Sequence, residues 1–327
     1  MERRDFLKDA AAGAALVGLA GRGHGAPAPL ARATVVQVHL AGSAAATGAE
    51  RTVALEKMLA AGIAKLTGRT GEAAWKGLFK PDDVVALKVN CLSGRIATTV
   101  ALADVVARGV LSAGVKGEHC LVYERSQREL LAAGYTMGPQ PGGYRVVATD
   151  QGEFGWEAET TKVGEGQQRL TKIVTQKATA LVSLPIVKDH NIAGVTGALK
   201  NHYGDIQRPG ELHRLGLEQH IPALAALPPL RGKLRLVVGD ALTTLYEGGP
   251  MNRPDRRHVL DCILLSLDPL AYDAATWKII EDVRAAKGLP TLARAGREPT
   301  WLKVAAAAPY QLGIADPARI DVVRIEL

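Results

Sequence analysis

Short runs rich in β-branched residues alternate with longer runs rich in Ala and Leu along the first third of the chain. Apolar runs typical of strands span residues 34–40, 84–90 and 120–124, and helical spacing of apolar residues spans 51–66 and 98–113. Strand, helix and strand at this spacing form a βαβ unit, whose parallel strands need cover on both faces. The pattern predicts an α/β fold with a mostly parallel sheet and helices on both faces.

The same alternation continues to the C-terminus. It predicts further strands and helices, the strands at 144–148, 180–184, 234–239, 259–266 and 320–325, and the helices at 219–227, 270–286 and 301–308. Residues 149–168 are polar and Gly-rich with little periodicity, which predicts a surface excursion or hairpin inserted in the domain. Because no internal repeat or low-complexity tract interrupts the pattern, we expect one α/β domain over residues 34–327.

The first 33 residues have the features of an export signal. The segment RRDFLK, which begins at Arg3, resembles the twin-arginine consensus, and the apolar run at residues 10–21 follows it. That run is too short to cross roughly 30 Å of hydrocarbon, and it has no polar face, which argues against a cytosolic amphipathic helix. We therefore expect export by the twin-arginine machinery, cleavage near Ala33, a periplasmic or secreted protein, and no stable membrane span after cleavage.

Charge and cysteine content narrow the classes of partner. The formal net charge is +7, of which the first 33 residues supply +2, and aromatic residues make up only 4% of the chain. Since no Lys/Arg block is interleaved with aromatics, a nucleic-acid surface is not expected, and a small anionic molecule is the better match. Cys91, Cys120 and Cys262 form no C-x-x-C motif, so an iron–sulfur cluster from local motifs is not expected. Either two of them form a disulfide or all three are buried thiols.

Polar residues follow two of the predicted strands. Lys88 and Asn90 lie two apart on the strand at 84–90 and share one face at its carboxyl end, where open α/β sheets place their ligands. A lysine on an apolar strand cannot stay unpaired in a dry core. Lys88 either meets a carboxylate or faces an anionic ligand.

The second polar group lies in the segment LPIVKDHNIAGVTGALKNHYGDI, residues 184–206. Pro185 ends the preceding strand, so residues 188–190 are predicted in a loop and a helix is predicted from about Asn191. On that helix, residues 192, 195, 199 and 203 would form an apolar stripe, with Gly194 and Gly197 on the other side for close packing or a ligand. The expected crevice suits a carboxylate or phosphate and is lined by Lys188, His190, Thr196, Lys200 and Asn201.

Metal binding and acid–base chemistry are competing uses of the remaining polar residues. Four of the eight histidines fall within residues 190–220, without the i, i+4 pairing of a helical zinc motif, so a metal stays undetermined. No Walker or dinucleotide motif is present. Asp268 is expected to cap a helix, Asp273 lies one turn later near the helix dipole, and Asp240, at a predicted strand end, has no evident structural role.

These motifs together resemble the domain-of-unknown-function family 362. The resemblance covers residues 84–327 and implies no assigned reaction, although many members carry a ferredoxin-like module and look redox-associated. This chain lacks the cysteines for such a module. The residues that carry the resemblance are Lys88 and Asn90, the block from Lys188 to Asn201, Asp240 followed by Gly-Gly-Pro, and the S-x-D-P-x-A-x-D segment from Ser266 to Asp273.

The sequence thus predicts a redox- or metal-linked enzyme of unassigned reaction that binds a small anion or cofactor. His190 would be the acid or base, because histidine ordinarily titrates near neutral pH, and Asp240 and Lys200 would assist it. A non-catalytic binding or assembly factor and a purely structural polar network are the alternatives. The expected ligand-binding residues are Lys88, Asn90, Lys188, Thr196, Asn201, Asp268 and Asp273.

Overall fold

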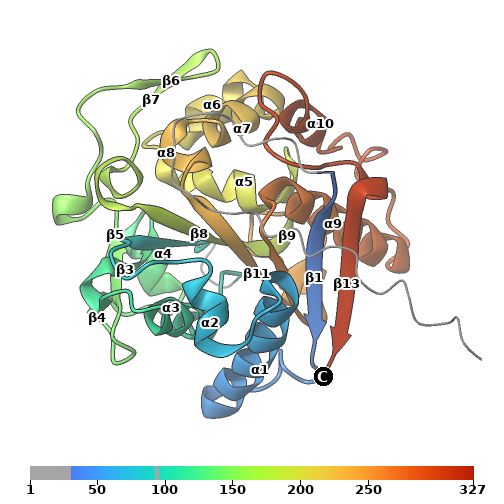
Figure 1. Cartoon of the computed structure of the whole chain (residues 1–327). Helices are drawn as coiled ribbons and strands as arrows, with labels where there is room; N and C mark the ends of the chain where they lie inside the picture. Colours follow the sequence, from blue (N-terminus) through green and yellow to red (C-terminus); the bar gives the residue numbers. More distant parts are fainter. Residues whose placement is uncertain (1–30, 93–95) are drawn as a thin grey trace, which may run out of the picture.

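A large mixed sheet forms the centre of the molecule (Figure 1). The computed structural model describes residues 31–92 and 96–327, and within them the strands run in the order β13-β1-β12-β11-β8-β2-β3-β5-β4, with β9 beside β11 and β10 beside β9. Their bounds are β1 Ala33–His39, β2 Val85–Val89, β3 Cys120–Glu124, β4 Gly138–Pro139, β5 Arg145–Ala148, β8 Ala180–Leu184, β9 Ile186–His190, β10 Gly194–Thr196, β11 Leu234–Leu245, β12 Arg257–Ser266 and β13 Ile320–Glu326.

The sheet is mixed, so the prediction of a mostly parallel sheet was wrong. Strands β11, β8, β2, β3 and β5 are mutually parallel, but β12 runs antiparallel to both β11 and β1, and β13 is parallel to β1. The physical reason lies in the connections. Residues 246–256 turn the chain directly from β11 back into β12, and such a short connection permits only antiparallel pairing, whereas parallel strands need a long crossover.

Helices cover both faces of the sheet, and alternate strand residues feed two separate cores. Leu87 of β2 and Val182 of β8 belong to the core under α1 and α3, whereas Ala86 and Leu181 belong to the core under α7 and α9. The two groups of helices lie on opposite sides of the sheet in Figure 1. The helices are α1 Gly48–Thr67, α2 Gly71–Lys76, α3 Val100–Ser112, α4 Gln127–Ala132, α5 Ala198–Asn201, α6 Pro209–Leu215, α7 Leu217–Ala225, α8 Pro228–Arg231, α9 Pro269–Ala286 and α10 Trp301–Ala306.

Residues 149–168 contain a small second sheet. Strands β6, Thr161–Val163, and β7, Gly166–Gln168, pair antiparallel with each other and not with the central sheet. The pair lies close to α6 and α7, and a Cβ on Gly166 would meet the Leu212 side chain at 2.6 Å. Within the part of the chain that the structure describes, no helix is both long and apolar enough to span a membrane.

The segment 184–206 folds differently from its prediction. Pro185 does end β8, but residues 188–190 lie in strand β9, which pairs with β11 and with β10. The predicted helix from Asn191 is replaced by a β9–β10 hairpin and the short helix α5. Gly194 at the hairpin has a φ of +78°, a left-handed conformation that interrupts a helix and that glycine adopts without strain.

Candidate functional site

The polar residues of this segment are divided between two buried groups. One group, here called the Lys188 network, joins Lys88, Asn90, Lys188 and Asn201 by hydrogen bonds across β2, β9 and α5. The other, the Lys200 cluster, consists of His190, Lys200, Tyr203 and His213. The single crevice expected from the sequence therefore becomes two environments with different chemistry.

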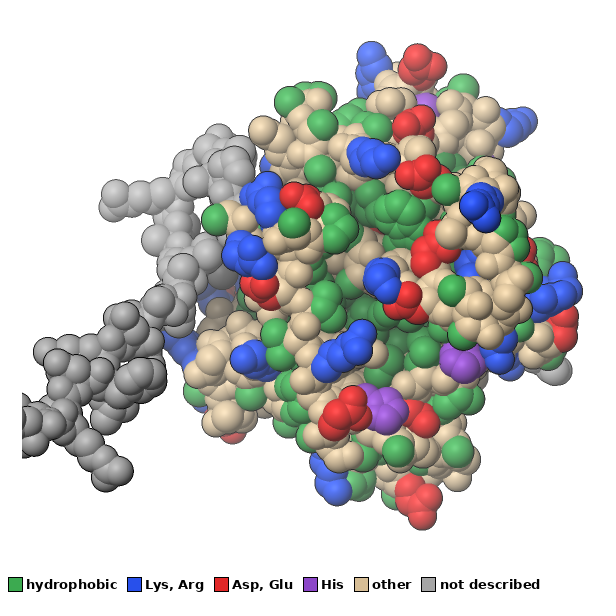
Figure 2. All heavy atoms as spheres, turned by 90° about the vertical axis from the view of Figure 1, so that its right-hand side faces the viewer, with side chains coloured by type: hydrophobic (Ala, Val, Ile, Leu, Met, Phe, Trp, Pro, Cys, Tyr) green, Lys and Arg blue, Asp and Glu red, His purple; other side chains and the backbone are tan. Residues whose placement is uncertain are grey.

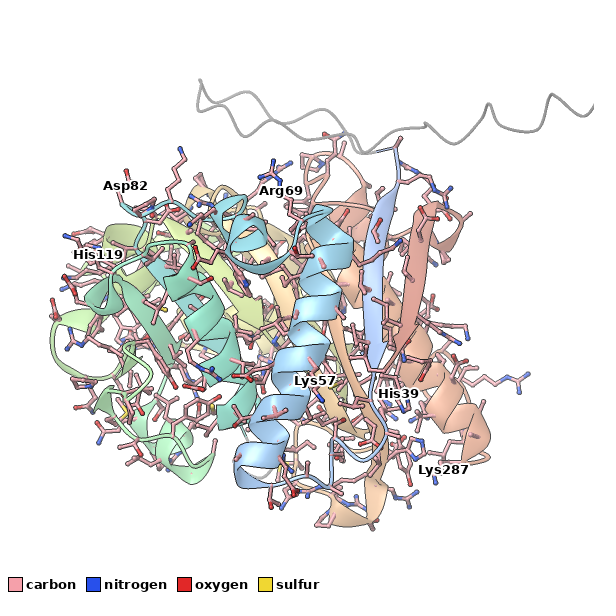
Figure 3. All side chains as sticks on the ribbon, turned by 60° about the horizontal axis from the view of Figure 1, so that its bottom comes forward. His39, Lys57, Arg69, Asp82, His119 and Lys287 are labelled. Carbon is pink, nitrogen blue, oxygen red and sulfur yellow. The ribbon has the colours of Figure 1, made fainter. Side chains whose placement is uncertain are left out.

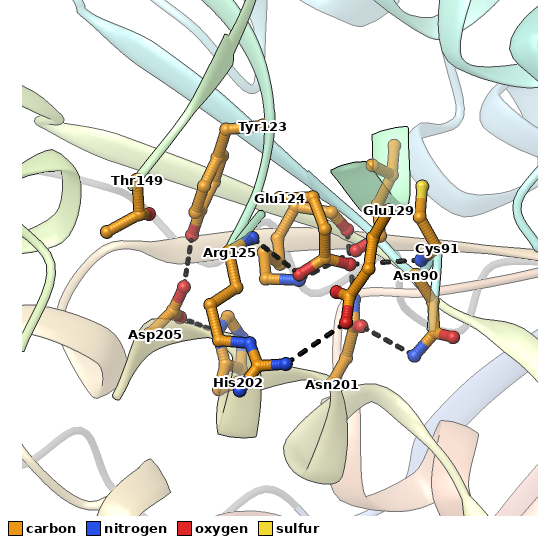
Figure 4. A network of polar contacts seen from close by, with 12 residues as sticks. Asn90, Cys91, Tyr123, Glu124, Arg125, Glu129, Thr149, Asn201, His202 and Asp205 are labelled. Carbon is orange, nitrogen blue, oxygen red and sulfur yellow. Dashed lines mark hydrogen bonds and ion pairs between the residues drawn. The ribbon is translucent and has the colours of Figure 1, made fainter. Parts of the chain in front are cut away.

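Lys88 meets a carboxylate, which is the first of the two alternatives weighed from the sequence. Its Nζ lies 2.6 Å from Glu124 Oε1 and 2.7 Å from the Val89 carbonyl oxygen, and both ion-pair partners are buried. Glu124 also accepts from the backbone N–H groups of Cys91 and Arg125 (Figure 4). Lys88 is thus fully compensated by the protein. Sequence reasoning missed Glu124, although its position at the end of β3, beside β2, was a usable signal.

Lys188 is compensated by neutral oxygens. Its Nζ donates to Asn90 Oδ1 at 2.9 Å and to the carbonyl oxygens of Leu92 and Ile96 at 3.3 Å. Asn90 in turn donates to Asn201 Oδ1 (Figure 4), and Asn201 donates to the Lys88 carbonyl oxygen. Burial lowers the pKa of Lys188 to about 8. The amides of Asn90 and Asn201 therefore connect the two lysines and have their own protein partners.

A third polar arrangement was not found from the sequence. The Tyr123 hydroxyl donates to Asp205 Oδ1 at 2.9 Å, and His202 Nδ1 lies 2.6 Å from Asp205 Oδ2 (Figure 4). All three residues are buried, and among the described residues His202 Nε2 has no hydrogen-bond partner. The i, i+3 spacing of His202 and Asp205 was the available signal.

Among the described residues, Lys200 is a buried lysine whose amine has neither a carboxylate nor an oxygen acceptor as a hydrogen-bond partner. The residue is 6% exposed, its Nζ lies 3.1 Å from His213 Nε2, and the same atom lies 4.2 Å from the centre of the Tyr203 ring. Within residues 31–92 and 96–327, no Asp or Glu lies within ion-pair distance of it. Burial, with a smaller effect from Lys188, lowers the pKa of Lys200 to about 7.

The two histidines of the cluster are neutral and have defined tautomers. His213 Nδ1 lies 2.7 Å from the Pro209 carbonyl oxygen and must donate to it, so Nε2 presents a lone pair to Lys200. His190 Nδ1 accepts from the backbone N–H groups of Ile192 and Ala193, both at 3.2 Å, so its proton is on Nε2. Burial, together with the charge of Lys200, lowers the pKa of His190 to about 2 and also lowers that of His213.

These shifts change the role open to His190. It was expected to be the acid or base because free histidine titrates near neutral pH, but the buried ring stays neutral there. The ring packs against His213, with 5.7 Å between ring centroids and 25° between planes. His190 can therefore donate a hydrogen bond through Nε2–H. The buried hydroxyls of Tyr203, within the cluster, and of Thr196, close to it in sequence, have no hydrogen-bond partner among the described residues.

The three predicted carboxylates accept hydrogen bonds from backbone N–H groups. Asp268 caps α9 as expected, with its carboxylate accepting from Leu270 and Ala271. Asp273 accepts from the N–H groups of Ala198 and Leu199 at the start of α5, which is a different role from the dipole of its own helix. Burial raises the pKa of Asp268, and raises that of Asp273 to about 8.

Asp240 does have a structural role, contrary to the expectation. Its carboxylate accepts from the N–H groups of Thr99 at 2.8 Å and Leu242 at 3.2 Å, and burial raises its pKa. Strand β11 continues past it to Leu245 because this half of the strand pairs with β9 and β12. The Gly-Gly-Pro turn after the strand contacts Asp189 instead, which accepts from Gly248 and Gly249.

A surface cleft of about 400 Å³ is lined by Ile192, Ala193, Arg297 and Trp301 among others, and by no member of the Lys200 cluster. The N–H groups of Ile192 and Ala193 donate to His190 Nδ1, which links this lining to the cluster. Arg297 forms ion pairs with Asp189 at 2.7 Å and Glu247 at 2.6 Å. On the face shown in Figure 2, charged side chains of both signs are interspersed, with apolar surface between them.

Groups of side chains suited to a metal ion are absent from the described residues. There, no three His, Cys, Asp or Glu side chains gather so that they could hold one. Cys91, Cys120 and Cys262 are buried free thiols, which decides between the alternatives left open for them. Burial raises the pKa of Cys120 and Cys262 to about 12.

Fold and site together define an α/β protein with a buried, carboxylate-free lysine cluster. The family described as Domain of unknown function (DUF362) matches residues 85–278, so the chain belongs to that family. No curated protein matches the chain. A crystal structure of a Thermotoga maritima protein is similar at 14% identity and a TM-score of 0.39, over 67% of this chain. This chain spans 60% of that protein, and a likeness at this level bears on neither site nor reaction.

Proposed function

We propose that this protein binds a small anionic molecule at the Lys200 cluster. The observation that carries the proposal is Lys200 itself, a buried lysine whose amine has His213 Nε2 as its polar contact and no carboxylate among the described residues. A buried cation without a counter-charge costs folding free energy, so the position is expensive unless a ligand compensates it. By contrast, Lys88 already has Glu124 as its counter-charge.

The surroundings of Lys200 favour an anion over a cation. Lys188, Lys200 and Arg297 all act on His190 as positive charges that lower its pKa. The Asp189 carboxylate nearby is occupied by Arg297 and two backbone N–H groups. Donors are thus in excess, and a carboxylate or phosphate would accept from them.

Calorimetric titration of the protein with phosphate, acetate and a 2-oxo acid tests this proposal. We expect at least one anion to bind, and we expect Lys200→Met to weaken that binding by about tenfold or more, because one charge-assisted hydrogen bond is lost. Lys57→Met is the matched control, since Lys57 is exposed on α1 (Figure 3). Equal affinity in the Lys200→Met variant would contradict the proposal.

We further propose that the protein is an enzyme that converts the bound anion to a product, with Lys200, His190 and His213 as the groups that take part in the reaction. A non-catalytic binding or assembly factor is the alternative, and it needs the same cations but no proton acceptor. Substitution of His213 by Gln replaces the basic ring nitrogen that faces Lys200 with an amide that does not take up a proton. Loss of turnover with retained anion affinity supports an enzyme, and binding without turnover of any bound anion supports the alternative.

Export by the twin-arginine pathway to the periplasm is a separate proposal. Arg3 and Arg4 carry it, and they lie outside the described residues. Fractionation of cells that express the full chain tests it. Replacement of both arginines by lysine is expected to retain the protein in the cytoplasm, and unchanged export of that variant would overturn the proposal.

A further inference from the structure

We propose that Lys200 reacts as a free amine with the carbonyl carbon of a small 2-oxo carboxylate and holds it as an imine. This inference rests on the anion site proposed above and names its substrate class. The juxtaposition that supports it is a buried amine 3.1 Å from the Nε2 lone pair of His213, whose ring packs against the ring of His190, a histidine with its proton on Nε2.

Three buried lysines in one region allow an internal comparison. Lys88 is held as an ammonium by Glu124 at 2.6 Å, and Lys188 donates all three of its hydrogens to oxygen acceptors. Among the described residues, Lys200 has neither a carboxylate nor an oxygen acceptor in its hydrogen bonds. Of these three, Lys200 is therefore the amine whose neutral form the surroundings favour, and a neutral amine is the nucleophilic form.

His213 is placed to accept and return the proton. Its Nδ1–H is fixed on the Pro209 carbonyl oxygen, so Nε2 faces the Lys200 amine as an acceptor. The ring must be neutral before it can accept a proton, and burial, which lowers its pKa, keeps it so. His190 then supplies Nε2–H to the carboxylate of the substrate, since its Nδ1 is occupied by two backbone N–H groups.

The reaction balances without an added oxidant or reductant. The lone pair of the neutral amine attacks the carbonyl carbon and forms a C–N bond, and one N–H proton passes through His213 Nε2 to the former carbonyl oxygen to give a carbinolamine. His213 Nε2 then takes the second proton from nitrogen and delivers it to the hydroxyl oxygen, the C–O bond breaks, and water leaves. The products are one imine and one water from one amine and one carbonyl group.

Trapping with cyanoborohydride tests the inference on the full chain. The protein is incubated with glyoxylate and cyanoborohydride near pH 7, and modified lysines are identified by mass spectrometry of peptides. We expect Lys200 to be modified at least about tenfold faster than Lys57 and Lys287, which are exposed to solvent (Figure 3). Modification of Lys200 no faster than of those two lysines would overturn the inference.

Two further measurements separate this inference from the proposed anion site. Phosphate has no carbonyl group, so phosphate binding without trapping overturns the imine and leaves the anion site intact, whereas no binding of either anion overturns both. The His213→Gln variant keeps the lysine but loses the proton acceptor. A trapping rate at Lys200 that falls by about tenfold in this variant supports the inference, and an unchanged rate contradicts the role of His213.

Discussion

At the scale of single residues, three buried lysines of this protein differ in the partners that their ammonium or amine groups have. Lys88 has a carboxylate partner, Lys188 has three neutral oxygen acceptors, and Lys200 has one imidazole nitrogen. Burial lowers the pKa of Lys188 to about 8 and that of Lys200 to about 7. What distinguishes the site is therefore that the buried amine of Lys200 has no counter-charge among the described residues, and not the number of polar residues around it.

The ion pair of Lys88 is expected to serve the fold. Lys88→Met leaves Glu124 buried without its counter-charge, and we expect it to lower the free energy of unfolding by about 3 kcal/mol or more. Urea unfolding of this variant measures the loss. The double variant with Glu124→Gln should recover most of it, because neither charge is then buried alone. If Lys88→Met unfolds like the unmodified chain but loses anion binding, Lys88 belongs to the ligand site instead.

The sequence identified most members of the buried groups but not their partners. Lys88, Lys188 and Lys200 stand out because a charge on an apolar run is costly, which is a local property. Glu124 and His213 become partners only when distant segments meet, at sequence separations of 36 and 13 residues. Glu124 could have been inferred from the neighbouring strands of the predicted βαβ unit, whereas the contact of His213 with Lys200 could not, because it depends on how the chain packs after α5.

At the scale of elements, the β9–β10 hairpin shows where periodicity misleads. Residues 192, 195, 199 and 203 follow helical spacing, yet three of these four are buried by a hairpin, a short helix and a 3₁₀ turn. Gly194 in the left-handed conformation and the Asp273 carboxylate at the N–H groups of Ala198 and Leu199 fix the break. By contrast, all five residues of β3 are buried, and both ends of this strand agree with the prediction from the sequence.

Gly197 is expected to tolerate no side chain. A Cβ at this position would overlap with Asp273 Oδ1, and that carboxylate is held by the start of α5. We expect Gly197→Ala to lower the free energy of unfolding by about 2 kcal/mol or more. Gly210→Ala in α6 is the matched control, because an added Cβ there would have no described atom within 4 Å, and it should be neutral or slightly stabilising. Equal effects of the two substitutions in urea unfolding would refute this packing argument.

At the scale of the whole molecule, the α/β class followed from the sequence, whereas the mixed sheet did not. The alternation of strands and helices gives the layers, but the direction of β12 depends on a short return from β11 that the pattern does not reveal. Pairing of β1 with β12 and β13 is likewise set by contacts between segments far apart in the chain.

The burial of Lys200 should make the free energy of unfolding depend on pH. Its pKa is about 7 in the folded protein against an ordinary value of 10.5, so between these values the unfolded chain binds more protons and stability rises with pH. The slope from this one group is up to about 1.4 kcal/mol per pH unit. Lys200→Met should therefore be more stable than the unmodified chain below pH 7, with the difference shrinking toward pH 10. A difference that stays constant from pH 7 to pH 10 in urea unfolding would contradict the shift.

The position of β1 has a consequence for how the chain folds during synthesis. Both of its partners, β12 and β13, begin at or after Arg257, so this strand emerges from the ribosome long before either of them can pair with it. Contacts between such distant segments carry a large loop-closure cost and form slowly. The sheet therefore cannot be completed until β13 has emerged. Until then both edges of β1 are unpaired, and we expect the nascent chain to be prone to aggregation and to be a substrate for chaperones.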